Sequence, residues 1–246
     1  MKRALAYLLV ITAAEVITVT IEPVWGIVIH ILLLVVLVLH SALARNQAYQ
    51  ELLLSMALVP LIRILSLAMP LANIPQVWWY PIIYVPLLVA ALQVIRLLGY
   101  RLGQIGLNVK RISTQLALAL TGFVFGMAEY FILIEEAEVT GPVLQETWLL
   151  SAFLLLVCTG FVEELIFRGV LQRSAVQLFG WWGIVYVSLL FAVVHWIHNS
   201  LLDIVYVFFV ALFFGWAVKK TGSLFGVTLS HGIANIVLFL IAPLLF

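Results

Sequence analysis

The sequence predicts an all-α protein: a polytopic transmembrane helix bundle of eight or nine spans. Of its 246 residues, 65% are hydrophobic and only 9% are charged, whereas soluble domains carry about 25% charged residues. The apolar residues gather in runs near the ~20 residues that cross ~30 Å of hydrocarbon as a helix. Backbone groups in lipid must be satisfied within each segment, and the runs lack the alternation of barrel strands, so helices are expected.

Nine such runs are expected to form the spans. They cover residues 4–21, 24–43, 51–69, 77–98, 115–134, 147–172, 181–199, 201–218 and 224–245. The first is read as a span rather than a removed signal peptide, because no small-residue cleavage site follows it and Glu15 interrupts it. The short hairpin at Pro23 and the tight link near Asn199 leave eight spans open.

The charges between the runs predict the orientation. Basic residues such as Lys2, Arg3 and the pair Lys219–Lys220 fall on alternate connections, and lysine and arginine favour the cytoplasmic side. We therefore expect a cytoplasmic N-terminus and, with nine spans, an external C-terminus. The apolar composition predicts membrane lipid as a partner. The net charge of +1 and the lack of a long basic block predict no nucleic acid as a partner.

Ionisable and strongly polar side chains inside the runs are functional candidates, since each costs a few kcal/mol or more at membrane depth. They are Glu15, His30, Arg63, Glu129, Glu163, Glu164, His195, His231 and Asn235. We expect Arg63 to form a structural bridge with Glu15 or Glu129, and Glu129 is also a candidate for lining a cavity. The acidic run 135–138 is expected to be a solvated outer loop.

Two adjacent carboxylates form the first pattern. Successive residues of an α-helix point about 100° apart, so Glu163 and Glu164 cannot easily share one role. Glu164 and Arg168 are four residues apart and can pair on one face. Glu163 is then available to face a cavity as a general base. The alternative is a structural Glu–Arg pair at a helix end.

Histidine and asparagine form the other two patterns. His195 follows Phe191 by four residues, and a neutral imidazole can accept or donate a proton. His231 and Asn235, also four apart, share a helix face and offer two donors of the kind that a developing oxyanion needs. Alone, each pattern also fits helix packing.

The three patterns are predicted to lie at a similar depth in the membrane. At about 1.5 Å per helical residue, Glu163 lies roughly 15 Å from Arg173, and His195 lies roughly 20 Å from Trp181. His231 and Asn235 lie roughly 17–22 Å from Lys220. The sequence therefore predicts that all four side chains meet near the middle of the membrane.

The ordered patterns resemble the CPBP family, which comprises CAAX-type prenyl-protein endopeptidases and bacteriocin-processing or Abi-type membrane proteins. The resemblance rests on Glu163-Glu164-x-x-x-Arg168, Phe191-x-x-x-His195 and His231-x-x-x-Asn235, and covers about residues 100–245. The basic, glycine-containing connection 99–114 is expected to divide the chain into an N-terminal four-span half (1–98) without a recognised motif and a CPBP-like catalytic bundle (99–246). We expect the protein to lie in a bacterial or archaeal plasma membrane.

The resemblance implies a metal-independent glutamic intramembrane endopeptidase without a cofactor, acting on a membrane-associated protein or peptide. Glu163 would activate the attacking water and His195 would assist it. His231 and Asn235 would form the oxyanion hole, and Glu164 and Arg168 would support these groups.

Three alternatives remain open. A zinc peptidase would use Glu163, His195 and His231 as ligands, because two histidines and a glutamate form a known catalytic zinc set. A transporter would use the same residues as a proton relay. A non-catalytic membrane scaffold or immunity protein would not depend on Glu163.

Overall fold

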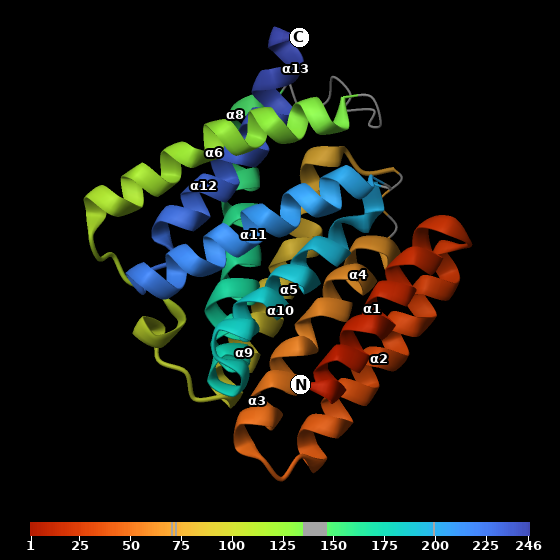
Figure 1. Ribbon diagram of the computed structural model, residues 1–246. Helices are drawn as coiled ribbons and strands as arrows, with labels where there is room; N and C mark the ends of the chain where they lie inside the picture. Colours follow the sequence, from red (N-terminus) through yellow and green to blue (C-terminus); the bar gives the residue numbers. More distant parts are fainter. Residues whose placement is uncertain (70, 72, 135–146, 199) are drawn as a thin grey trace.

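The computed structural model describes residues 1–69, 71, 73–134, 147–198 and 200–246, with no side-chain detail at 197 and 198. Within those ranges the chain is helical and contains no strand, which confirms the all-α prediction (Figure 1). The acidic run 135–138 and the link at Asn199 lie outside the described residues.

The α-helices follow one another along the chain, joined by short 3₁₀ and π-helical segments. They are α1 (Lys2–Thr20), α2 (Pro23–Leu43), α3 (Gln47–Met56), α4 (Leu58–Ala68), α5 (Trp79–Leu97), α6 (Ile112–Leu133), α8 (Trp148–Leu154), α9 (Gln172–Phe179), α10 (Trp181–Val194), α11 (Leu201–Thr221), α12 (Phe225–Ile236) and α13 (Ala242–Leu245). The 3₁₀ segments are η1 (Gln76–Trp78), η2 (Leu102–Ile105) and η5 (His195–His198), and the π-helical segments are η3 (Leu155–Glu163), η4 (Leu165–Leu171) and η6 (Val237–Ile241).

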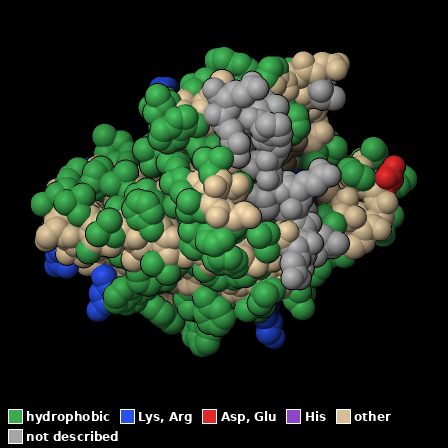
Figure 2. All heavy atoms as spheres, turned by 90° about the horizontal axis from the view of Figure 1, so that it is seen from above, with side chains coloured by type: hydrophobic (Ala, Val, Ile, Leu, Met, Phe, Trp, Pro, Cys, Tyr) green, Lys and Arg blue, Asp and Glu red, His purple; other side chains and the backbone are tan. Residues whose placement is uncertain are grey.

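Eight helical stretches in the described part of the chain are long and apolar enough to cross a membrane. They coincide with eight of the nine predicted runs. The remaining run, predicted over 181–199, forms α10, whose 14 residues rise only about 21 Å of the ~30 Å of hydrocarbon. Hydrophobic side chains cover most of the described surface seen in Figure 2, and charged ones lie at its edges. The protein is therefore an integral membrane protein, and eight spans are favoured over nine.

The N-terminal hairpin packs against the C-terminal half. Pro23 begins α2, and α1 and α2 lie side by side at one edge of the bundle (Figure 1). On its other side, α1 contacts α10, where the Tyr186 hydroxyl donates to the carbonyl of Ala4 at 2.9 Å. The first two spans thus help to hold the helix that leads to His195.

Glycines bring α12 close to two neighbouring helices. A Cβ added at Gly122 of α6 would lie 2.3 Å from the carbonyl oxygen of Ser230, and one added at Gly126 would lie 2.2 Å from that of Ala234. On the η3 side, a Cβ at Gly160 would lie 2.9 Å from the backbone nitrogen of Gly232. Small residues let membrane helices approach in this way, and here they set α12 beside the segment that carries Glu163.

The long helical stretch Trp148–Phe179 is largely π-helical in its middle. Segments η3 and η4 are joined at Glu164, directly after Glu163. π-Helical turns inside α-helices are rare and occur frequently at functional sites. The paired carboxylates therefore lie where the two π-helical segments meet.

Candidate active site

The four predicted catalytic side chains line one central cavity of about 240 Å³. Glu163 comes from the end of η3, His195 from the residue after α10, and His231 and Asn235 from one face of α12. Polar side chains form part of its lining, and the cavity is large enough for several water molecules, since one occupies about 30 Å³ in the liquid. Three separate helical segments therefore bring these side chains to a common space.

Glu163 contacts groups from two other helices. The hydroxyl of Tyr84 in α5 donates a hydrogen bond to Oε1 of Glu163. Nε2 of His231 lies 3.9 Å from Oε2, and the Glu163 side chain keeps 13% of its surface exposed. One oxygen is thus held in place, while the other faces an imidazole across a gap.

Glu164 belongs to a fully buried polar cluster beside the cavity. Its Oε1 lies 2.8 Å from Nη1 of Arg168 and 2.9 Å from Nδ1 of His231. Glu164 has no exposed surface and Arg168 has 3%. The guanidinium carbon of Arg168 lies 4.2 Å from the ring centroid of Phe191, so the cation is both paired and stacked. The ion pair expected from the four-residue spacing is present.

The hydrogen bonds of the two histidines determine which ring nitrogen carries a hydrogen. Because a carboxylate only accepts, Nδ1–H of His231 donates to Glu164. Nε2 of His231 therefore carries a hydrogen only in the imidazolium form. In the same way, Nδ1–H of His195 donates to the carbonyl of Phe191 at 2.8 Å, which places the lone pair of the neutral ring on Nε2.

Asn235 is oriented by the π-helical segment. Its Nδ2 donates to the hydroxyl of Thr159 at 2.8 Å, and Thr159 donates in turn to the carbonyl of Leu155. Nδ2 carries two hydrogens, so a second one is available for a substrate. The amide and His231 both line the cavity.

Arg63 of α4 also lines this cavity. Its Nη2 lies 2.8 Å from Oε2 of Glu15 and 2.5 Å from the carbonyl oxygen of Val194, the residue before His195. The predicted bridge between Arg63 and Glu15 is therefore confirmed. Through Val194, the same guanidinium also holds the end of α10.

Glu129 of α6 lines the cavity as well. It also lines a smaller neighbouring cavity of about 40 Å³, together with His195, His231 and Asn235. The prediction that Glu129 lines a cavity near Glu163 is therefore confirmed.

Tyr84 and Thr159 were missed from the sequence. Tyr84 lies four residues after Tyr80, one helical turn beyond the aromatic residues 78–80 at the predicted membrane boundary. Thr159 lies one turn before Glu163. A polar side chain one turn inside an aromatic boundary, or one turn from an intramembrane carboxylate, was the available signal.

Across the ranges that the structure describes, no group of three or more His, Cys, Asp or Glu side chains is placed to hold a metal ion. Glu163, His195 and His231 share the cavity but do not form a ready ligand set there.

Residues 145–237 match the family model described as type II CAAX prenyl endopeptidase Rce1-like. The matched segment contains all six residues on which the predicted site rests, and it confirms the resemblance to the CPBP family. Residues 1–144, which contribute Arg63, Tyr84 and Glu129, lie outside it. No curated protein and no solved structure matches the chain.

Proposed function

We propose that this chain, whose residues 145–237 match the type II CAAX prenyl endopeptidase family, is a glutamic intramembrane endopeptidase. It hydrolyses a peptide bond of a membrane-associated protein or peptide, with Glu163 as the base that activates water. The observation that carries the proposal is the shared cavity, which joins one partly exposed carboxylate, two imidazoles and an amide inside the membrane-spanning bundle.

Water activation rests on Glu163. A water molecule beside Oε2 loses a proton to this carboxylate as its oxygen attacks the carbonyl carbon of the substrate. Tyr84 holds the other carboxylate oxygen, so the base keeps one orientation. Nε2 of neutral His195 carries a lone pair that can accept a hydrogen bond from the same water and align it.

The developing oxyanion is stabilised by Asn235 and His231. The second Nδ2 hydrogen of Asn235 is one donor, and Nε2–H of His231 is the other. Because Nδ1–H of His231 is committed to Glu164, this role requires the imidazolium form, which adds a positive charge beside the oxyanion. Preorganised donors of this kind are typically the largest electrostatic contribution to acyl transfer.

Collapse of the tetrahedral intermediate completes the reaction. The carbon–nitrogen bond breaks as the carboxyl group of Glu163 returns its proton to the leaving amine. The products are a new carboxyl terminus and a free amino terminus, and the carboxylate is restored for the next cycle. The atoms balance with water as the one co-reactant.

The test is cleavage of a farnesylated peptide with a CAAX-type tail, and of the same peptide without the lipid, by purified protein in lipid vesicles. Wild type is expected to release product from the lipidated peptide. Glu163→Gln and His195→Ala are expected to release none above background at matched protein abundance. Tyr7→Phe, which changes a hydroxyl bonded to His40 outside the cavity, serves as a control that keeps activity.

Two results would overturn the proposal. Full cleavage by both site variants would remove Glu163 and His195 from the mechanism. Loss of activity in a chelator, together with stoichiometric zinc in the purified protein, would favour the metal-dependent alternative.

A further inference from the structure

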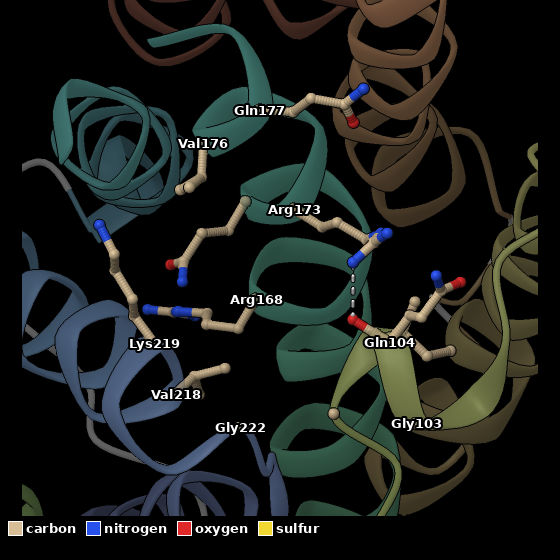
Figure 3. A pocket seen from close by; sticks show the side chains of 12 residues that line it. Gly103, Gln104, Arg168, Arg173, Val176, Gln177, Val218, Lys219 and Gly222 are labelled. Carbon is tan, nitrogen blue, oxygen red and sulfur yellow. Dashed lines mark hydrogen bonds between the residues drawn. The ribbon is translucent and has the colours of Figure 1, made fainter. Parts of the chain in front are cut away.

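A second pocket, of about 490 Å³, lies at one end of the bundle, away from the central cavity. We call it the basic pocket; the residues used below are Gln104, Arg168, Gln172, Arg173 and Lys219. In Figure 3, Arg168 extends from its helix toward α11, the helix that carries Lys219, and Arg173 extends toward Gln104. Three helical segments and the connection after α5 thus surround one space.

The charged side chains that line this pocket are all positive among the described residues. Three of its described lining residues are cations and none is a carboxylate. Glu164 already compensates Arg168, but neither Arg173 nor Lys219 forms an ion pair with any residue that the structure describes. Two positive charges therefore face the pocket without a partner of opposite sign.

Buried donors without acceptors point to a ligand. Nη2 of Arg168 and Nε of Arg173 are both buried and have no hydrogen-bond partner. Arg168 is 97% buried, because its exposed fraction is 3%. A buried guanidinium hydrogen without an acceptor costs free energy, and an anion in the pocket would supply oxygen atoms for such hydrogens. The amide side chains of Gln104 and Gln172 offer further polar contacts.

The position of the pocket indicates where the anion comes from. Gln104 lies between the span that ends at Leu97 and the span that begins at Ile112, and Lys219 lies in the last turn of the span that ends at Thr221. The pocket is therefore at the level where spans end and lipid phosphates lie. Basic pockets between membrane helices bind lipid headgroups in this way.

We propose that the basic pocket binds the phosphate group of an anionic phospholipid. Arg173 and Lys219 provide the charge, Arg168 provides a buried donor, and the acyl chains remain in the surrounding bilayer. Arg168 also contacts Glu164, which holds His231. Two residues, Arg168 and Glu164, therefore lie between the bound phosphate and the proposed oxyanion donor His231, and this coupling to cleavage rests on the proposed function.

Binding can be measured without any cleavage. Delipidated protein in neutral detergent is titrated with short-chain phosphatidylglycerol, phosphatidylcholine or inorganic phosphate, and the unfolding temperature is followed, since a ligand of the folded state raises it. Phosphatidylglycerol is expected to give a saturable rise, and phosphatidylcholine, whose own cation neutralises its phosphate, a weaker one. An equal rise with inorganic phosphate alone would support the same site with a free anion as its occupant.

The chain offers a matched control for charge. Lys219→Gln and Arg173→Gln should each need roughly fivefold more phosphatidylglycerol for half of the rise. Lys220→Gln removes the same charge from the adjacent residue, which is exposed and does not line the pocket, and should match wild type. The proposal would be overturned if Lys219→Gln and Lys220→Gln needed the same phosphatidylglycerol concentration for half of the rise. It would also be overturned if neither phosphatidylglycerol nor inorganic phosphate gave a saturable rise in unfolding temperature. Either result leaves the proposed peptidase activity untouched.

Discussion

Nδ1 of His231 lies 2.9 Å from Oε1 of Glu164, so Glu164 is bonded to the same imidazole that faces its neighbour Glu163. Nε2 of the same ring lies 3.9 Å from Oε2 of Glu163. The two glutamates are neighbours in sequence, but one has no exposed surface and the other keeps 13% of its side chain exposed. Their contacts predict different roles in stability and catalysis.

Glu164→Gln should destabilise the fold far more than Glu163→Gln. Removing the Glu164 charge leaves Arg168 buried without its counter-ion, and breaking such a pair costs about 3–5 kcal/mol. Glu163 has no arginine ion pair among the described residues, and glutamine keeps an oxygen that accepts from Tyr84, so Glu163→Gln should cost about 1 kcal/mol, the typical value for a point mutation. Denaturant unfolding of both variants in the same detergent measures the difference. Equal losses of stability would show that the two glutamates are energetically equivalent, contrary to this prediction.

Asn235→Ala should lower kcat by about 10²–10³-fold with little change in KM, because an oxyanion donor acts mainly in the transition state. Thr159→Val should give a smaller loss, since it removes the acceptor that orients Asn235 but keeps the amide. Thr12→Val is the matched control, because Thr12 makes a similar hydrogen bond to a backbone carbonyl within α1. A loss that appears in KM alone would instead assign Asn235 to substrate binding.

Tyr84→Phe should lower kcat by about tenfold or more while the protein stays folded. The substitution removes the one hydroxyl that holds Oε1 of Glu163, and a hydrogen bond to a charged group contributes about 1.5–3 kcal/mol. Single-turnover rates on wild type and variant isolate this effect from product release. Unchanged rates would mean that the carboxylate keeps its orientation without Tyr84.

Arg63→Met should destabilise the protein by about 3–5 kcal/mol, because Glu15 then remains buried without its arginine partner, with only His30 at 3.4 Å beside it among the described residues. Arg63→Met combined with Glu15→Gln should recover part of the loss, since the second change removes the uncompensated charge. Unfolding temperatures of the two single variants and the double variant form the required cycle. Simple additivity of the two losses would indicate that the two side chains do not interact.

The sequence predicted the spans and the pair of Glu164 with Arg168 because both depend on local features. Composition alone locates apolar helices, and the four-residue spacing alone brings Glu164 to Arg168. The run 181–199 shows the limit of composition, which measures how apolar a segment is and not how long its helix remains. The helix α10 ends at Val194, and a 3₁₀ segment that begins with His195 follows.

Some contacts between distant segments were not predicted. Tyr84 is 79 residues from Glu163, and Arg63 is 131 residues from Val194. No helical periodicity links positions so far apart, because their meeting depends on how whole helices pack. Both signals were present as polar side chains within apolar runs, but the bond of Tyr84 to Glu163 and the bond of Arg63 to Val194 could be named only from the folded chain.

The bond from Arg63 to the carbonyl of Val194 also bears on how far the protein can be shortened. A fragment that begins after the fourth span would keep every motif residue but lose both Arg63 and Tyr84. The carbonyl oxygen of Val194 would then lose the hydrogen bond from Arg63 within the membrane, and the Glu163 side chain would lose the hydrogen bond from Tyr84 that orients it. The motif-bearing fragment expressed alone should therefore lack peptidase activity. Co-expression of the first four spans as a separate polypeptide should restore that activity.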